Sequence, residues 1–112
     1  MNDYSLVLNA ASANGHSLKV DLMNVKKAAL ILRAVNHKLR QQILQLIDEQ
    51  GRMTVTDIYV RLRLEQSVAS QHLAILRKAG FVKTERDGKF IYYAVNTQRM
   101  EELNNFVDEL LR

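Results

Sequence analysis

Residues 64–95 read LEQSVASQHLAILRKAGFVKTERDGKFIYYAV and predict a helix followed by a β-hairpin. The first half has the periodicity of a helix, and Gly80 follows it as the kind of left-handed residue that often ends one. Asp87-Gly88 is a strong signal for a two-residue turn between two strands. Such a turn would place Arg86 opposite Lys89.

The predicted helix presents two faces of different chemistry. A solvated face usually carries long Glu and Lys side chains, whereas short hydroxyl and amide groups suit a helix that lies against base edges in DNA. The apolar face comprises Val68, Ala69, His72, Leu73, Ile75, Leu76 and Ala79. The residues on or beside the opposite face that we expect to read bases are Gln66, Ser67, Ser70, Gln71 and Ala74.

Basic residues at the end of this helix and at the hairpin tip predict contacts with phosphate. The net charge is +4, and residues 33–99 hold twelve Lys or Arg against six Asp or Glu. Such a patch gains affinity for DNA by releasing counterions. Like charges paired across an isolated hairpin are unfavourable by about 0.2–1 kcal/mol, so a basic tip is better explained by a shared phosphate. The expected phosphate contacts are Arg77, Lys78, Arg86 and Lys89.

The rest of the sequence predicts one domain at residues 18–112, preceded by a disordered tail at residues 1–17. Apolar residues at helical spacing from Leu18 to Leu32 indicate a first helix. A second helix ends at Gly51, and Met53 and Val55 are expected to add a short strand beside the hairpin. The expected caps of the second, third and last helices are Asn36, Thr54, and Asn96 or Thr97, respectively.

The predicted first and last helices each carry a stripe of apolar side chains, which another surface must bury. A chain of 112 residues buries an adequate but not a generous core, so pairing with a second copy would stabilise it. We therefore expect a homodimer formed through these two helices. The expected interface residues are Leu22, Val25, Ala29, Leu32, Met100, Leu103, Val107 and Leu110.

Six short motifs follow one another along the chain: RQQIL (40–44), VTDI (55–58), SQHL (70–73), LRKAGFV (76–82), RDGK (86–89) and YY (92–93). In this order and spacing they closely resemble the ArsR/SmtB family of bacterial winged-helix repressors, over residues 20–110. The resemblance implies a winged helix-turn-helix fold, mainly α with a small β-hairpin (α+β). Four helices, the fourth being the recognition helix, would be followed by two strands and a fifth helix. It also implies a dimer through the terminal helices.

The residues depart from the metal sensors of that family. Sensors of the thiolate type carry two cysteines in the third helix, at the positions of Tyr59 and Arg61, and this chain has no cysteine. Sensors that use the last helix take Asp and His ligands from both subunits, and residues 97–112 contain no histidine. A zinc site needs three or four such ligands at defined spacing. We therefore expect no metal and no cofactor.

The sequence gives no sign of an enzyme or of a membrane span. Ser70 and His72 lie about 200° apart around a helix and cannot act as a nucleophile and its base. His72 is expected to be a hydrogen-bonded, partly buried structural residue, His37 a surface residue and His16 part of the tail. A run of eighteen apolar residues is missing, so we expect a cytoplasmic protein.

From these observations we expect a transcriptional repressor that binds double-stranded DNA in a sequence-specific way. It would act as a homodimer on a pseudo-palindromic operator and would not respond to metals. Two alternatives remain at this point. One is a winged-helix adaptor that docks another protein through the same face, without specific DNA binding. The other is a DNA-binding regulator with a small-molecule effector at its dimer interface.

Overall fold

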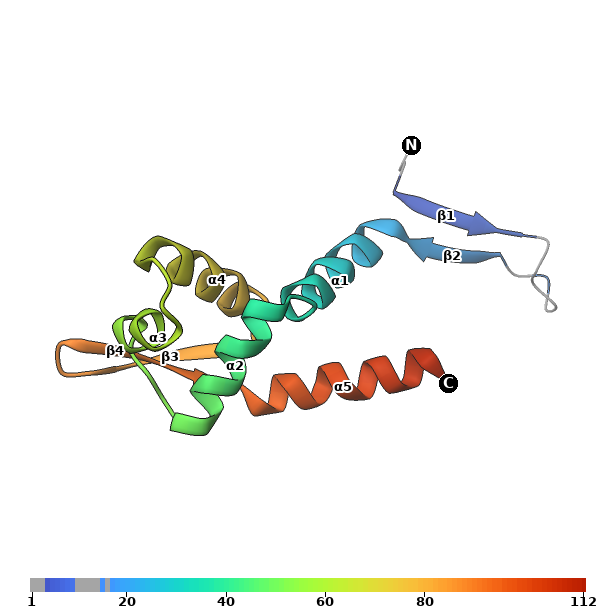
Figure 1. Ribbon diagram of the computed structural model, residues 1–112. Coiled ribbons are helices and arrows are strands. Elements are labelled where there is room, and N and C mark those ends of the chain that lie inside the picture. Colours follow the sequence, from blue (N-terminus) through green and yellow to red (C-terminus); the bar gives the residue numbers. More distant parts are fainter. Residues whose placement is uncertain (1–3, 10–14, 16) are drawn as a thin grey trace. The chain divides into compact units, whose positions relative to one another are not determined.

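The computed structural model describes residues 4–9, 15 and 17–112. Two compact units divide the chain, Met1–Arg33 and Ala34–Arg112. The first strands and helix are β1 (Ser5–Leu8), β2 (Leu18–Asp21) and α1 (Leu22–Val35), coloured blue to cyan in Figure 1. The elements that follow are α2 (Lys38–Gln50), α3 (Val55–Leu62), α4 (Gln66–Lys78), β3 (Val82–Asp87), β4 (Phe90–Val95) and α5 (Thr97–Leu111).

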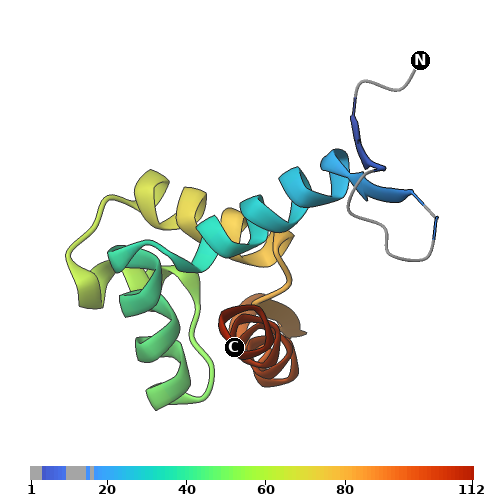
Figure 2. The same cartoon turned by 90° about the vertical axis from the view of Figure 1, so that its right-hand side faces the viewer.

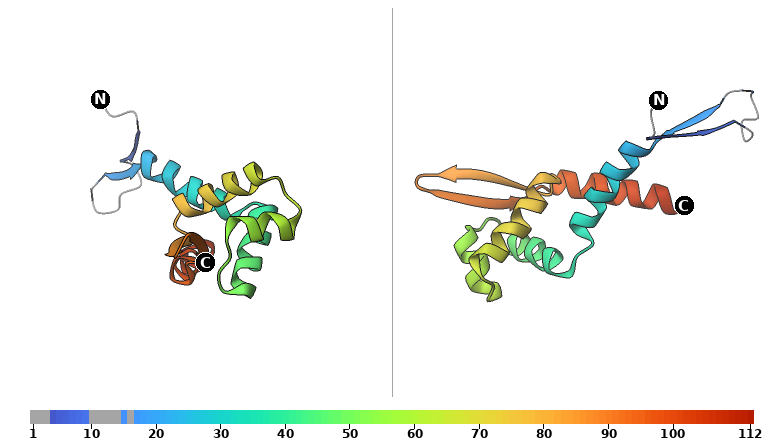
Figure 3. Two further views of the ribbon diagram at one scale, coloured as in Figure 1. Left: turned by 90° about the vertical axis from the view of Figure 1, so that its left-hand side faces the viewer. Right: turned by 90° about the horizontal axis from the view of Figure 1, so that it is seen from above.

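The unit Ala34–Arg112 has the element order of a winged helix-turn-helix, as predicted. Helices α2, α3 and α4 precede the antiparallel hairpin β3–β4, which is the wing, and α5 follows it. The wing projects beyond the helices in the right-hand view of Figure 3, and α5 is seen end-on in Figure 2. The α+β fold class expected from the sequence is therefore confirmed.

The core of this unit lies between α2, α3, α4 and the base of the wing. Its largest fully buried side chains are Phe81, Ile43, Ile47, Ile58, Leu73 and Leu76. The spacing of these residues along α2 and α4 places each set on one helix face. Ile75 was expected on this face too, but 41% of it is exposed. It lies about 100° around the helix from Leu76 and about 160° from Leu73, so it falls outside the buried stripe.

Side chains cap three helices of this unit, two of them with an expected residue. Thr54 Oγ1 accepts a hydrogen bond from the Asp57 amide at 3.2 Å, and Asn96 Oδ1 accepts one from the Arg99 amide at 3.2 Å. The cap of α2 is His37 rather than the expected Asn36, because the helix starts at Lys38. The Nδ1 atom of His37 accepts from the Leu39 amide at 3.2 Å.

The wing differs from the expected hairpin by two residues in register. Asp87 pairs with Phe90 and Arg86 with Ile91, so the turn is Gly88-Lys89 and not Asp87-Gly88. Gly88 has a φ of 63°. A glycine with positive φ in the first turn position is typical of type II′, whereas a type I′ turn at Asp87-Gly88 would also need positive φ at Asp87. The expected pairing of Arg86 with Lys89 is therefore wrong.

Met53 adds a third strand position to the wing, as predicted, whereas Val55, which was expected in the same strand, is the first residue of α3. Its amide and carbonyl both bond to Tyr93, at 3.0 and 2.7 Å. The order across this small sheet is thus Met53, β4, β3. Met53 is only 3% exposed, and this pairing attaches the wing to the core.

In the unit Met1–Arg33 the structure differs from the expected tail. Strands β1 and β2 form an antiparallel hairpin that pairs Leu6 with Val20 and Leu8 with Leu18. The expected first helix begins at Leu22 instead of Leu18, because Asp21 Oδ1 caps it by accepting from the amides of Met23 and Asn24. Residues 1–3, 10–14 and 16 of the expected tail lie outside the described residues.

Candidate nucleic-acid interface

The outward face of α4 carries all the residues of this helix that were expected to meet DNA. Leu73 and Leu76 hold the opposite face in the core, so the helix cannot rotate without unburying them. The exposed residues are Gln66, Ser67, Ser70, Gln71, Ala74, Arg77 and Lys78. The structure therefore brings together on one helix the short polar side chains and the two cations that follow them.

Glu65 stands at the N-cap of α4, where its side chain makes no capping hydrogen bond. A carboxylate at this end favours the helix dipole, by about 0.3–1 kcal/mol in exposed positions. The same negative charge lies beside Gln66 and Ser67 at the exposed start of the helix. It would oppose a phosphate group that approached this end.

His72 attaches the inner side of α4 to the start of α2. Its Nδ1 atom accepts a hydrogen bond from Arg40 Nη1 at 3.2 Å, and Arg40 Nε donates to the Ala34 carbonyl at 2.7 Å. Arg40 is only 6% exposed, and the ring of His37 lies 4.9 Å from that of His72. Burial lowers the pKa of His72, and the charges of His37 and Arg40 lower it further. The expected structural role of His72 is confirmed.

The wing carries its two expected cations near the turn. Arg86 and Lys89 are both exposed, and Arg86 Nε donates to the Gly88 carbonyl at 3.3 Å. In the observed register Arg86 lies on one face of the wing, whereas Glu85 and Asp87 lie on the other. Near the tip, one face therefore carries the cation of Arg86 and the other carries two carboxylates.

The carboxylate side of the wing is covered by Arg52, a residue that the sequence did not single out. Its Nη1 and Nη2 atoms lie 3.3 Å from Glu85 Oε1 and 3.0 Å from Asp87 Oδ2. Its guanidinium carbon also lies 4.0 Å from the centroid of the Tyr92 ring. The hydrogen bonds to Asp87 and Glu85 raise the pKa of Arg52. No spacing rule links residue 52 to residues 85 and 87, so only the register of the sheet reveals the cluster.

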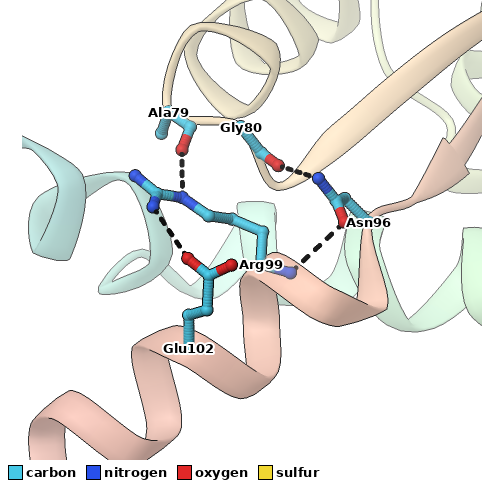
Figure 4. A network of polar contacts seen from close by, with 5 residues as sticks. All are labelled: Ala79, Gly80, Asn96, Arg99 and Glu102. Atoms are coloured by element: carbon cyan, nitrogen blue, oxygen red, sulfur yellow. Dashed lines mark hydrogen bonds and ion pairs between the residues drawn. The ribbon is translucent and has the colours of Figure 1, made fainter.

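A second cluster missed from the sequence joins the end of α4 to the start of α5 (Figure 4). Asn96 Nδ2 donates to the Gly80 carbonyl at 3.0 Å, while its Oδ1 caps α5. Arg99 Nε donates to the Ala79 carbonyl at 3.2 Å, and Arg99 Nη1 lies 3.3 Å from Glu102 Oε2. The side chains of Arg99 and of Asn96, the N-cap of α5, therefore satisfy backbone carbonyls that follow the last turn of α4.

The residues expected at a dimer interface are apolar and incompletely covered in each unit. In the described chain no residue of α5 is buried, and Leu110 is 65% exposed. Met100, Leu103 and Val107 are half-buried. On α1, Leu22 and Val25 are 38% and 52% exposed, Ala29 is exposed and Leu32 is half-buried.

The two positions at which thiolate-type sensors of the ArsR/SmtB family carry cysteines are occupied here by Tyr59 and Arg61. Tyr59 is half-buried, and Arg61 lines an open cavity of about 370 Å³ together with Arg52 and Asp57. Two guanidinium groups at one cavity disfavour a cation there. Among the described residues no three His, Cys, Asp or Glu side chains lie close enough to hold a metal. In the same part of the chain, no helix is both long and apolar enough to cross a membrane.

Comparison with known proteins finds similarity over the region that contains α4. The family model described as "Bacterial regulatory protein, arsR family" matches residues 37–84. An uncharacterised HTH-type transcriptional regulator of Methanocaldococcus jannaschii is 40% identical over 85 residues, covering 76% of this chain and 96% of that protein. The transcriptional activator HlyU of Vibrio cholerae is 33% identical over 88 residues, covering 78% and 80%.

A third relative links the sequence to a solved structure. The transcriptional repressor PagR of Bacillus anthracis is 32% identical over 83 residues, covering 74% of this chain and 83% of that protein. Its crystal structure superposes with a TM-score of 0.61 at 30% identity, over 76% of this chain and 97% of that chain.

Proposed function

Since this chain belongs to the arsR family of bacterial regulatory proteins, we propose that it is a repressor that binds a pseudo-palindromic operator as a homodimer. The chain is a DNA-binding transcriptional regulator of the helix-turn-helix type. The observation that carries the proposal is the exposed face of α4, which combines short polar side chains with two cations. A regulator of this kind acts in the cytoplasm, where bacterial DNA lies, and we propose no catalytic role.

Recognition divides between two sets of residues. Hydroxyl and amide groups on α4 meet base edges and carry the sequence preference, and the Ala74 methyl group contacts a thymine methyl. Cations at the end of α4 and on the wing bind phosphate and fix the position of the protein on the duplex. The base-reading set is Gln66, Ser67, Ser70, Gln71 and Ala74, and the phosphate-binding set is Arg77, Lys78, Arg86 and Lys89.

Selection from random duplexes tests this division. Wild-type protein should return a consensus of two related half-sites, whereas a protein-docking adaptor would return none. Gln71→Ala should weaken binding at one base position by about 1–3 kcal/mol and relax the preference there. Arg86→Ala, the matched change on the wing, should weaken binding to all sequences alike. A Gln71→Ala variant with unchanged affinity and consensus would refute the assignment of this face.

The homodimer is supported by the partly exposed apolar residues of α1 and α5. Each subunit contributes one recognition helix, so two copies are needed to read both half-sites. Replacing Leu103 and Val107 together by Asp should give a monomer that binds the operator much more weakly. Sedimentation of the wild type and the variant measures this difference, and a wild-type monomer at roughly ten micromolar would contradict the proposal.

We also propose that metals do not regulate this protein. Metal control requires a site whose affinity differs between free and DNA-bound protein. Tyr59 and Arg61 supply no thiolate, and α5 supplies no histidine. Zinc added to the protein–operator complex should leave its affinity unchanged relative to a chelator-treated sample. A saturable loss of binding would reveal a metal site. The zinc titration would then be repeated on a variant that lacks His16, which lies outside the described residues.

A further inference from the structure

The short strand beside the wing gives Arg52 a position that faces away from the core. Met53 pairs with Tyr93 and is buried, so the residue before it projects from the opposite face of the sheet. On that face Glu85 pairs with Tyr92, and Asp87 pairs with Phe90. The register therefore lines up Tyr92 and the two carboxylates on the side to which Arg52 projects.

Arg52 reaches across the full width of this small sheet. It starts beside β4, passes over the Tyr92 ring with 4.0 Å between the guanidinium carbon and the ring centroid, and binds two residues of β3. The two ion pairs, at 3.3 and 3.0 Å, use both terminal nitrogens of the guanidinium. The planar guanidinium supplies charge and also fixes the geometry of both ion pairs. A lysine would supply the charge alone.

The two carboxylates matter because the wing lies at the proposed phosphate contact. Residues 82–90 carry Lys83, Arg86 and Lys89 against Glu85 and Asp87. A phosphate that approaches Arg86 comes near both negative charges, which lie one residue to either side of it in the same strand, on the opposite face of the wing. The cation of Arg52 lies against both of them and comes from outside the wing.

We propose that Arg52 is a positioning residue for DNA binding, which holds the wing to the end of α2 and offsets the repulsion between its two carboxylates and phosphate. The inference rests on the proposed function, because it assumes that the wing contacts the duplex. It assigns no DNA contact to Arg52 itself. Its role is exerted through Glu85 and Asp87, so the effect of removing Arg52 must depend on whether those two charges are present.

A double-mutant cycle on the selected operator duplex tests this dependence. Arg52→Ala should weaken binding about tenfold, and Arg52→Lys, which keeps the charge but loses the fork, should weaken it less. Glu85→Gln with Asp87→Asn should change the affinity of the wild type by less than about twofold. In the Arg52→Ala background the same two substitutions should restore most of the lost affinity.

The control is Arg112→Ala, which removes an exposed arginine paired with Glu109 on α5 and should leave affinity unchanged. Thermal melting of each variant separates loss of binding from loss of folding. The inference is overturned if Arg52→Ala binds as the wild type does, or if neutralising Glu85 and Asp87 has the same effect with and without Arg52. Should the wild type bind no duplex at all, the proposed function fails instead.

Discussion

The described residues form two antiparallel hairpins, β1–β2 and β3–β4, and neighbouring segments stabilise them in different ways. The wing has Phe81 and Val82 buried at its base, Met53 paired along one edge and Arg52 across one face. In β1–β2 one face presents Leu6, Leu8, Leu18 and Val20, of which Leu18 is 54% exposed, and no described residue of its unit is buried. Two strands alone are marginally stable in water. The wing therefore gains its stability from its neighbours, and β1–β2 has no comparable core within its own unit.

The largest expected effect comes from the buried base of the wing. Phe81→Ala should lower the free energy of unfolding by about 3–5 kcal/mol, because it removes a fully buried aromatic side chain and leaves a cavity. Leu18→Ala in β1–β2 should change it by less than about 0.5 kcal/mol. Urea denaturation followed by circular dichroism measures both. Equal losses would show that the two hairpins share one cooperative core.

Substitution of Asn96, which joins the base of the wing to α5, should have the second-largest effect on stability. The backbone amide of Asn96 donates to the Phe81 carbonyl at 2.8 Å, and its side chain bonds to Gly80 and caps α5. Asn96→Ala should cost about 0.5–2 kcal/mol. Asn96→Asp keeps the capping oxygen but loses the donor to Gly80, so it should cost less than Asn96→Ala in the same denaturation experiment. A larger loss for Asp would mean that repulsion between its second carboxylate oxygen and the Gly80 carbonyl outweighs the retained cap.

The two hairpin loops offer a matched pair of glycines. Gly88 and Gly15 have φ values of 63° and 77°, and a Cβ atom at either one would meet no atom within 4 Å. Alanine in the left-handed region costs about 1–2 kcal/mol. Gly88→Ala should therefore destabilise the unit Ala34–Arg112 by about that amount. Gly15→Ala should leave the unfolding of that unit unchanged. An equal shift in both urea midpoints would contradict independent unfolding of the two hairpins.

Acidification should produce the smallest change, and only in the unit that contains His72. The pKa of His72 is lowered by burial and by the charges of His37 and Arg40. Near pH 6.5, the ordinary pKa of histidine, the unfolded chain therefore binds more protons than the folded chain does. Stability is complete above this pH and is lost as the pH falls through the lower pKa of the folded state. His72→Gln, which keeps an acceptor for Arg40, should flatten the profile measured by denaturant unfolding between pH 5 and 8, roughly the range in which histidine titrates. An unchanged slope would assign the pH dependence to other groups.

How much the sequence predicted differs between the two hairpins for a physical reason. Helical periodicity predicted α3, α4 and α5, with capping residues at α3 and α5, and the Asp-Gly turn signal predicted the wing, because these signals are local and the core depends on them. The turn at Gly88-Lys89 was placed one residue too early, since Asp-Gly is a common type I′ pair and the ion pair that holds Asp87 in the strand comes from Arg52. Strands β1 and β2 were missed because each has only four residues, within a segment rich in Asn, Ser and Ala.

The candidate interface shows the same limit. The exposed face of α4 follows from the spacing of its apolar residues, so its polar residues were predicted correctly as exposed. Arg52 and Arg99 act through contacts between segments far apart in the sequence. Such contacts depend on tertiary packing, which periodicity does not report.

The junction in Figure 4 also has a mechanical consequence. With 15 residues and a rise of about 1.5 Å per residue, α5 is a lever about 22 Å long. A tilt of about 5° at its root would move the far end by about 2 Å. Asn96 and Arg99 lie at the start of α5, where their side chains donate hydrogen bonds to the carbonyls of Gly80 and Ala79. In a dimer joined along α5, the stiffness of these two hydrogen bonds would set how much variation in half-site spacing the recognition helices can tolerate.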